Sequence, residues 1–245
     1  FFVLSPTFIA HGRYVTTDVA AAFAFFIGIA SFLWFLERAT YARAAWAGAA
    51  LGIALLLKFS TVLLLPLDAL FALTWLFVAH FEDLRRRGWG AAVIRYMRHL
   101  LRLLVPSLVL AAVALGVVWG VYAFHVQNYP AERQLSDSAE YLKTFGFRPV
   151  VNATLWMAGN SFTRPLAQYV LGILMVIQRA AGGNTTYFLG DITNMGWWYY
   201  FPVAFLLKES LPFLLLGTGA LLIAVRFVRR ASKKSFADAV WWTRD

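Results

Sequence analysis

The chain has 245 residues, 61% of them hydrophobic, and its mean hydropathy is +0.66. Soluble domains contain roughly 45–50% apolar residues, so this composition excludes an ordinary soluble protein and predicts an integral membrane protein. The absence of cysteine excludes disulfides and thiolate metal sites.

Apolar stretches divide the chain into predicted membrane spans. The first ten residues read as the end of a span broken near Pro6, and because Phe1 lies in an apolar run without an initiator methionine, we expect an internal piece of a longer polytopic protein. A span needs about 20 apolar residues (range roughly 17–25). The expected spans are 19–36, 44–57, 61–79, 103–124 and 201–225, the second extending back towards Arg43 and the third interrupted by Pro66 and Asp68.

Two long segments between these spans have a different character. Residues 80–102 are basic and partly amphipathic, as a helix lying at the membrane surface would be. Residues 125–196 form a long loop, and its apolar part, 166–177, is too short to cross the bilayer, which predicts an interfacial or re-entrant helix. The fold class is therefore an all-α polytopic membrane protein, a multi-span helical bundle with a long external loop.

The predicted organisation has four parts. They are membrane spans at 1–124, an external loop at 125–196, an aromatic belt with a final span at 197–225, and a basic segment at 226–245.

The basic residues predict the orientation of the chain. Cytoplasmic loops of membrane proteins carry an excess of lysine and arginine. If Asp18 faces outward, most of the 22 lysines and arginines fall in three cytoplasmic segments, 37–43, 80–102 and 226–245. The net charge of +10 is then explained by anionic lipid head groups rather than by nucleic acid, for which no binding motif is present.

Three residues at the predicted outer boundary are candidates for a site. Asp18 is either a helix cap or a carboxylate that acts as a base or orients an acceptor, with Arg13 holding a phosphate. Lys58 lies between two apolar runs, where it either snorkels to the interface or binds a lipid phosphate. All three residues are predicted to lie on the outer side of the membrane, together with the 125–196 loop and the aromatic belt.

The segment 187–210 combines a polar turn, an aromatic cluster and charged residues. Asp191 is a turn residue or a ligand contact. Trp197 and Trp198 form an interfacial anchor or a platform for a sugar. Lys208 forms an ion pair with Glu209 or contacts a ligand. The four histidines lack metal-ligand spacing, so no metal site is predicted.

Three blocks of the chain resemble bacterial members of glycosyltransferase family 39, which includes protein O-mannosyltransferases and lipid A aminoarabinose transferases. They are LSPTFIAHGRYVTTDVAAAF, LGIALLLKFSTVLLLP and YFLGDITNMGWWYYFPVAFLLKESLP. The family's Arg-Tyr-x-x-x-Asp pattern falls on Arg13, Tyr14 and Asp18, and its lysine between spans falls on Lys58. The family's principal catalytic acid is expected upstream of Phe1.

The resemblance implies an enzyme that moves a sugar from a polyprenyl-phosphate carrier to a protein, lipid or glycan acceptor at the outer face of the bacterial inner membrane. No cofactor is implied with certainty, and the sequence does not decide whether a divalent metal takes part. The alternative is a transporter or lipid flippase, because lysines within or between spans also mark transport paths.

Overall fold

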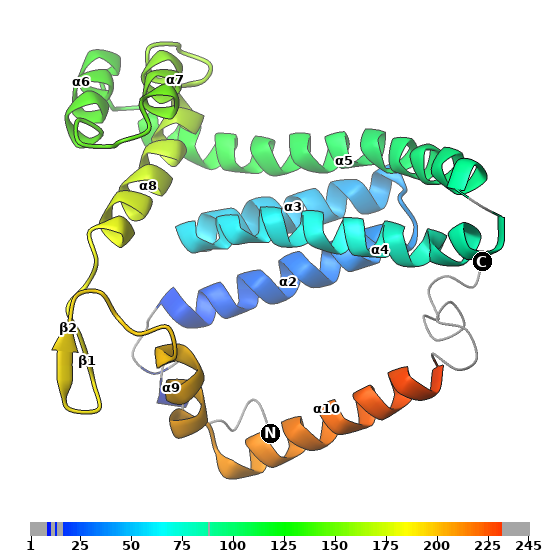
Figure 1. The fold of residues 1–245 in the computed structure, drawn as a ribbon. Helices are drawn as coiled ribbons and strands as arrows, with labels where there is room; N and C mark the ends of the chain where they lie inside the picture. The colour runs from blue at the N-terminus through cyan, green and yellow to red at the C-terminus, as the bar shows by residue number, and fades with distance from the viewer. Residues whose placement is uncertain (1–8, 11–12, 14–16, 88, 232–245) are drawn as a thin grey trace.

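The structure, a computed structural model, describes residues 9–10, 13, 17–87 and 89–231. Helices dominate the described residues (Figure 1). In chain order, the elements are α2 (Thr17–Glu37), α3 (Tyr41–Leu57), the 3₁₀ helix η2 (Phe59–Leu63), α4 (Leu64–Arg87), α5 (Trp89–Val126), α6 (Ala131–Tyr141), α7 (Arg148–Ala158), α8 (Arg164–Ala181), β1 (Thr186–Phe188), β2 (Asp191–Thr193), α9 (Tyr200–Lys208) and α10 (Leu211–Ala231).

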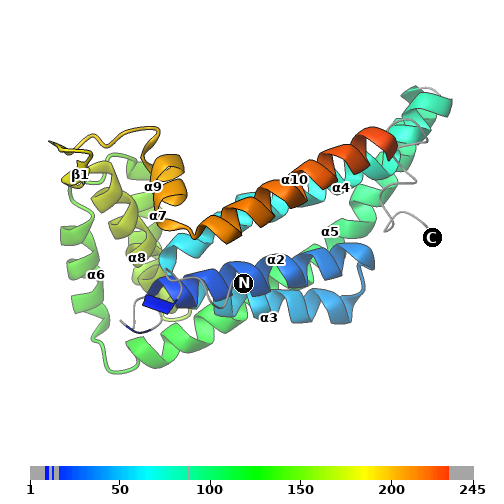
Figure 2. The ribbon, with the colours of Figure 1, turned by 90° about the horizontal axis from the view of Figure 1, so that it is seen from below.

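The helices α2, α3, α4 and α5 form an antiparallel bundle. Figures 1 and 2 show α6, α7 and α8 gathered at the end of the bundle where α2 begins and α5 ends. The turn between α2 and α3, and the connection between α4 and α5, lie at the opposite end. The bundle therefore has one end that carries the 125–196 loop and an opposite end that carries the arginine-containing connections between helices.

The bundle is built from apolar helices of membrane-crossing length. Among the described residues, Thr17–Glu37, Phe59–Phe77 and Met97–Val126 are long and apolar enough to cross a membrane, and α3 is a shorter apolar helix of 17 residues. Most of the surface of these helices is apolar side chain, as a lipid environment requires. The chain is an all-α polytopic membrane protein, as the sequence predicts.

The last predicted span, 201–225, is not continuous. It is divided into α9 and α10, which meet at an angle of 117°. Glu209 has an extended backbone, and Pro212 lacks the N–H that would continue the hydrogen-bond ladder back to Lys208. The predicted span at 201–225 is therefore bent, because this proline, next to the charged residues Lys208 and Glu209, ends the ladder.

The basic segment 80–102 is not a separate surface helix. It consists of the end of α4 and the beginning of α5, a helix of 38 residues. Such a helix is about 57 Å long, well beyond the ~30 Å hydrocarbon core. The arginines thus extend the spanning helices past the core. Pro66 does not interrupt the third span either, because it lies in the first turn of α4, where its missing N–H needs no partner.

Close packing of small residues holds α3 against α5. A Cβ atom added to Gly48 would lie 2.4 Å from the carbonyl oxygen of Leu110, and one added to Gly52 would lie 2.9 Å from that of Ala114. Together with Ala44, these glycines form a stripe at every fourth residue, the pattern by which membrane helices approach closely. Two backbones in contact bury no polar side chains and lose little side-chain entropy.

Arg164 fastens the helices of the 125–196 loop to the end of α5. Its Nε donates to Gln134 Oε1 at 2.9 Å, and its Nη2 donates to the carbonyl oxygens of Val126, at 3.3 Å, and Tyr129. Gln134, fully buried, donates in return to the Arg164 carbonyl at 3.0 Å. The guanidinium therefore satisfies carbonyl groups at the C-terminus of α5, where a positive charge is also favoured by the helix dipole.

We expect Gly48→Ala to lower the stability of the bundle by about 1–3 kcal/mol, because the new methyl group meets backbone that no rotamer change can move. Thermal unfolding in detergent measures the effect. Gly116→Ala in α5 is the matched control, since nothing lies within 4 Å of its added Cβ. It is expected to be neutral or slightly stabilising, because alanine is the better helix former. Equal losses in both variants would contradict the packing account.

Candidate functional site at the loop end of the bundle

Asp18 and Lys58 form an ion pair at the end of the bundle that carries the 125–196 loop. The Lys58 Nζ lies 2.6 Å from Asp18 Oδ1, and the two residues are 40 positions apart in the chain. Asp18 lies in the first turn of α2, and Lys58 is the residue that ends α3. The structure therefore brings together the two charged residues that the sequence singles out at the outer boundary.

The ends of two antiparallel helices explain why these residue types meet. The N-terminus of a helix carries partial positive charge and favours a carboxylate, whereas the C-terminus carries partial negative charge and favours a cation. Asp18 and Lys58 occupy the N-terminal end of α2 and the C-terminal end of α3, respectively. Asp18 is thus inside the first turn of α2 rather than its cap residue.

Thr61 stabilises the turn that contains Lys58. The Thr61 hydroxyl, fully buried, donates to the carbonyl oxygens of Ala54, at 2.7 Å, and Lys58, at 2.6 Å. Lys58 itself has an extended backbone between α3 and η2. A hydroxyl shared between the last turn of α3 and the turn residue satisfies carbonyl groups that the helix end would otherwise leave unpaired.

Helix α8, which belongs to the 125–196 loop, contacts the same turn from the other side. The Tyr169 hydroxyl donates to the Leu55 carbonyl at 3.2 Å, and its ring lies 5.7 Å from Phe59 and 5.5 Å from Tyr122. A Cβ at Gly172 would lie 2.3 Å from the Phe59 ring, so α8 and η2 are in direct contact. The stretch 166–177 is therefore helical, as predicted, and packs on the end of the bundle.

The ion pair is open to solvent or ligand. The Lys58 side chain is 33% exposed and the Asp18 side chain 57% exposed. Exposed ion pairs contribute only about 0–1 kcal/mol to stability. The fold therefore does not depend on this pair, and a ligand anion can replace the carboxylate as the partner of Lys58.

The other predicted residues of the first block are only partly described. Arg13 is exposed and precedes Asp18 by five residues. Tyr14 lies outside the described residues, as does the predicted break near Pro6.

The segment 187–210 forms a hairpin and an aromatic cluster of its own. Asp191 begins β2 and pairs with Phe188 across a turn in which Leu189 and Gly190 have positive φ. Two consecutive residues of this kind are typical of a tight hairpin turn. Asp191 is exposed beside that turn, and the sequence predicted the turn but not the strands.

The predicted aromatic belt gathers around Phe188. Its ring lies 5.5 Å from Trp197 and 5.0 Å from Tyr200, whereas Trp198 is 90% exposed and contacts Tyr199. Among the described residues, the ring contacts of Trp197 and Trp198 stay within this segment. Lys208 is exposed at the end of α9, at the bend before α10.

Asp68 is a candidate that the sequence reading treated only as an interruption of a span. Its side chain is buried in α4, and among the described residues its Oδ1 has no hydrogen-bond partner. The Nε1 of Trp75, two turns further along α4, is also buried and unsatisfied within the described part of the chain. An acidic residue in an apolar span is the signal that marks such a site.

The described residues contain no group of three or more histidine, aspartate or glutamate side chains placed to hold a metal ion. Comparison of the chain with protein-family models, with curated proteins and with solved structures gives no match. Any assignment of function therefore depends on the chemistry of the residues themselves.

We expect Tyr169→Phe to flatten the alkaline loss of stability. Burial raises the pKa of Tyr169 from 10.0 to about 12. Between these values the folded protein keeps a proton that the unfolded chain releases, so stability is full below pH 10 and falls as pH rises towards 12. Phenylalanine removes this pH-dependent component, on the order of 2 kcal/mol, and also removes about 1 kcal/mol of hydrogen bonding at neutral pH.

Thermal unfolding in detergent between about pH 9 and about pH 12 measures this difference. Tyr141→Phe, at an exposed tyrosine of α6, is the matched control and should keep the wild-type slope. A Tyr169→Phe protein with the same alkaline slope as wild type would show that this hydroxyl is not held as described.

Proposed function

We propose that the protein is a membrane glycosyltransferase that moves a sugar from a polyprenyl-phosphate carrier to an acceptor at the outer face of the bacterial inner membrane. The single observation that carries this function is the exposed pair of Lys58 and Asp18, 2.6 Å apart at one end of an apolar helix bundle. The resemblance of three sequence blocks to glycosyltransferase family 39 points in the same direction.

The pair contains the two charges that this transfer needs. A lipid phosphate at the membrane boundary needs a cation, and an ammonium group is a point-charge partner for it. When the phosphate binds Lys58, the Asp18 carboxylate loses its 2.6 Å contact with the ammonium group and becomes a stronger hydrogen-bond acceptor. Exchange of partners at Lys58 thus couples donor binding to the activation of a carboxylate.

The step balances with these groups alone. The bond between the sugar C1 and the phosphate oxygen breaks, and its electron pair stays on the phosphate. The acceptor hydroxyl oxygen forms the new bond to C1, and Asp18 takes the hydroxyl proton as general base. Lys58 and Arg13 stabilise the charge that develops on the leaving phosphate.

The surroundings of the pair fit a lipid-linked substrate. The helices below it present apolar side chains to the membrane, where a polyprenyl chain is soluble. Helices α6 to α8 lie at the same end of the bundle and are fastened there by Arg164, so they can restrict the access of water. Trp197 and Trp198 offer flat aromatic faces to a sugar, with Asp191 and Lys208 as polar contacts in the same segment.

We expect Asp18→Asn to lower sugar transfer by about 100-fold or more, because the amide cannot accept the proton. Lys58→Ala should raise the KM for the donor, because the phosphate loses its cation. The intact protein in proteoliposomes, supplied with a panel of polyprenyl-phosphate sugars, provides the assay. The matched controls are Glu140→Gln and Lys143→Ala, which alter an exposed ion pair, 3.7 Å long, between the end of α6 and the residues that follow it. Wild-type rates of sugar transfer in both Asp18→Asn and Lys58→Ala would contradict the assignment of these residues to the site.

Exchange of the two charges separates a structural role from a chemical one. The double variant Asp18→Lys with Lys58→Asp restores an ion pair between the ends of α2 and α3, although each charge then opposes its helix dipole. If the pair only joins helices, the double variant recovers the activity lost in the single variants. We expect it to stay inactive while it unfolds near the wild-type temperature.

Asp68 favours a second candidate, a transporter or lipid flippase. A buried carboxylate at membrane depth is functional by default, and a broken helix such as α9–α10 is a feature of transporter binding sites. The same proteoliposomes distinguish the two functions. Donor consumption with formation of a new glycoside supports the transferase, whereas movement of unaltered lipid or solute that is lost in Asp68→Leu supports transport.

A further inference from the structure

An apolar groove lies on the outside of the bundle between α2 and α3. It has a volume of about 480 Å³. Its lining residues come from both helices: Phe26, Ile27, Ala30, Ser31, Trp34, Trp46 and Ala50. The floor contains small residues, and the Ser31 hydroxyl is already satisfied because it donates to the Gly28 carbonyl at 3.0 Å. The lining of the groove is therefore suited to an apolar ligand.

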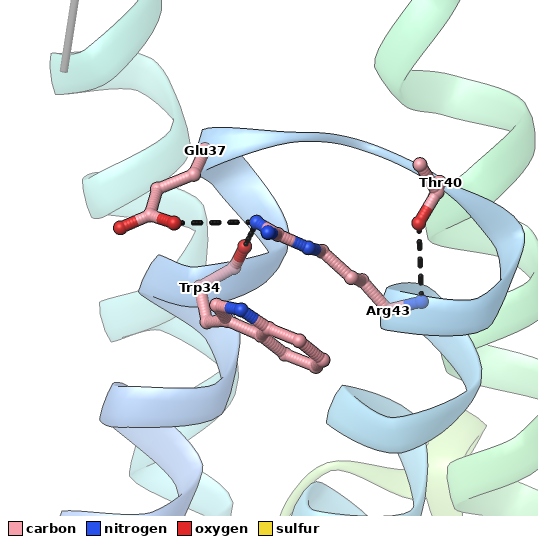
Figure 3. A network of polar contacts seen from close by, with 4 residues as sticks. All are labelled: Trp34, Glu37, Thr40 and Arg43. Carbon is pink, nitrogen blue, oxygen red and sulfur yellow. Dashed lines mark hydrogen bonds and ion pairs between the residues drawn. The ribbon is translucent and has the colours of Figure 1, made fainter.

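One end of the groove is polar. Trp34 lies one turn before Glu37, the last residue of α2, and Arg43 reaches both residues from the first turn of α3 (Figure 3). The Arg43 guanidinium lies 4.5 Å from the centre of the Trp34 ring. Its Nη1 donates to the Trp34 carbonyl at 2.6 Å and to Glu37 at 3.2 Å. A cationic group is thus fixed against Trp34, one of the residues that line the groove.

The polar end has binding capacity left. Arginine has five N–H donors, and among the described residues the side-chain hydrogen bonds of Arg43 all come from Nη1. Arg38 is also exposed, so the connection from α2 to α3 carries two arginines, Arg38 and Arg43, and a single glutamate, Glu37. From Phe26 to Trp34 the groove follows about 12 Å of helix. The site therefore has an apolar trough that ends at a net positive charge.

We propose that this groove binds one acyl chain of an anionic phospholipid, with the lipid phosphate at Arg43 and Arg38. The groove is on the outward face of helices that cross the membrane, so the bilayer supplies its occupant. A guanidinium stacked on tryptophan is held in one orientation, which suits recognition of a phosphate by two N–H groups. Trp34 and Trp46 are amphipathic rings of the kind found at head-group depth.

This lipid site is independent of the transferase chemistry. It lies at the end of the bundle opposite to the Asp18–Lys58 pair, because α2 runs from one end to the other. It is also at the end where the basic connections predict the cytoplasmic leaflet, in which anionic lipids attract arginine. The bound lipid would fasten the turn between α2 and α3.

The test is thermal unfolding of the detergent-solubilised protein with added phosphatidylglycerol, phosphatidylcholine or inorganic phosphate. A ligand that binds only the folded state raises the unfolding temperature in a saturable way. We expect phosphatidylglycerol to stabilise the wild type, with phosphatidylcholine at least tenfold weaker in apparent Kd and inorganic phosphate without effect. Ala30→Phe fills the groove and should raise the apparent Kd for phosphatidylglycerol at least tenfold. Arg43→Gln should have the same effect.

Two matched variants serve as controls. Ala111→Phe adds the same ring to an exposed position of α5, and Arg98→Gln removes an exposed arginine from the same helix. Both should keep the wild-type response. If Arg43→Gln does not fold, Arg38→Gln and Ala30→Phe decide. Equal responses to the two phospholipids, equal losses in the controls, or stabilisation by inorganic phosphate alone would overturn the proposed lipid site.

Discussion

The close approach of α3 to α5 is the constraint on which the rest of the bundle depends. Gly48 and Gly52 let the backbone of α3 reach the carbonyl groups of Leu110 and Ala114, and α3 also packs against α2. In a membrane, helices gain little from burying apolar surface against each other, so the fit of backbones and small side chains has to supply the association. Because α3 is held between α2 and α5, both of its ends have defined neighbours.

The two ends of α3 illustrate how one helix organises two sites. At the C-terminal end of α3, Lys58 contacts Asp18 of α2. At the N-terminal end of α3, Arg43 contacts Trp34 and Glu37, which also belong to α2. The first pair is partly exposed, so that a ligand can reach it. In the second, Arg43 is spread over a carbonyl, a carboxylate and a ring, and therefore holds an aromatic wall in place. Similar charges thus have different uses because their surroundings differ.

Helices α6, α7 and α8 add a second layer of packing at the end of the bundle that carries the Asp18–Lys58 pair. Arg164 ties them to the carbonyl groups at the end of α5, and Tyr169 ties α8 to the last turn of α3. These contacts use backbone carbonyls that helix ends leave unpaired, so the loop and the bundle stabilise each other. The loop is consequently a set of packed helices over the Lys58 turn, and its position bears directly on access to that residue.

The sequence by itself determined that the chain is a helical membrane protein and that four of its apolar stretches are helices. It also identified Asp18 and Lys58 as candidate residues. These follow from local composition: long apolar runs must satisfy their backbone internally as helices, and a charge at the edge of such a run is conspicuous. Only the tertiary structure decided that these two residues meet across 40 positions, that Asp68 is buried with one carboxylate oxygen unsatisfied within the described residues, and that the last apolar run bends by 117°. Apolar helices with lipid on one side and protein on the other have no strong polar face, so their sequences do not tell which side is buried. That choice depends on contacts between distant segments, such as Gly48 with Leu110 and Gly172 with Phe59.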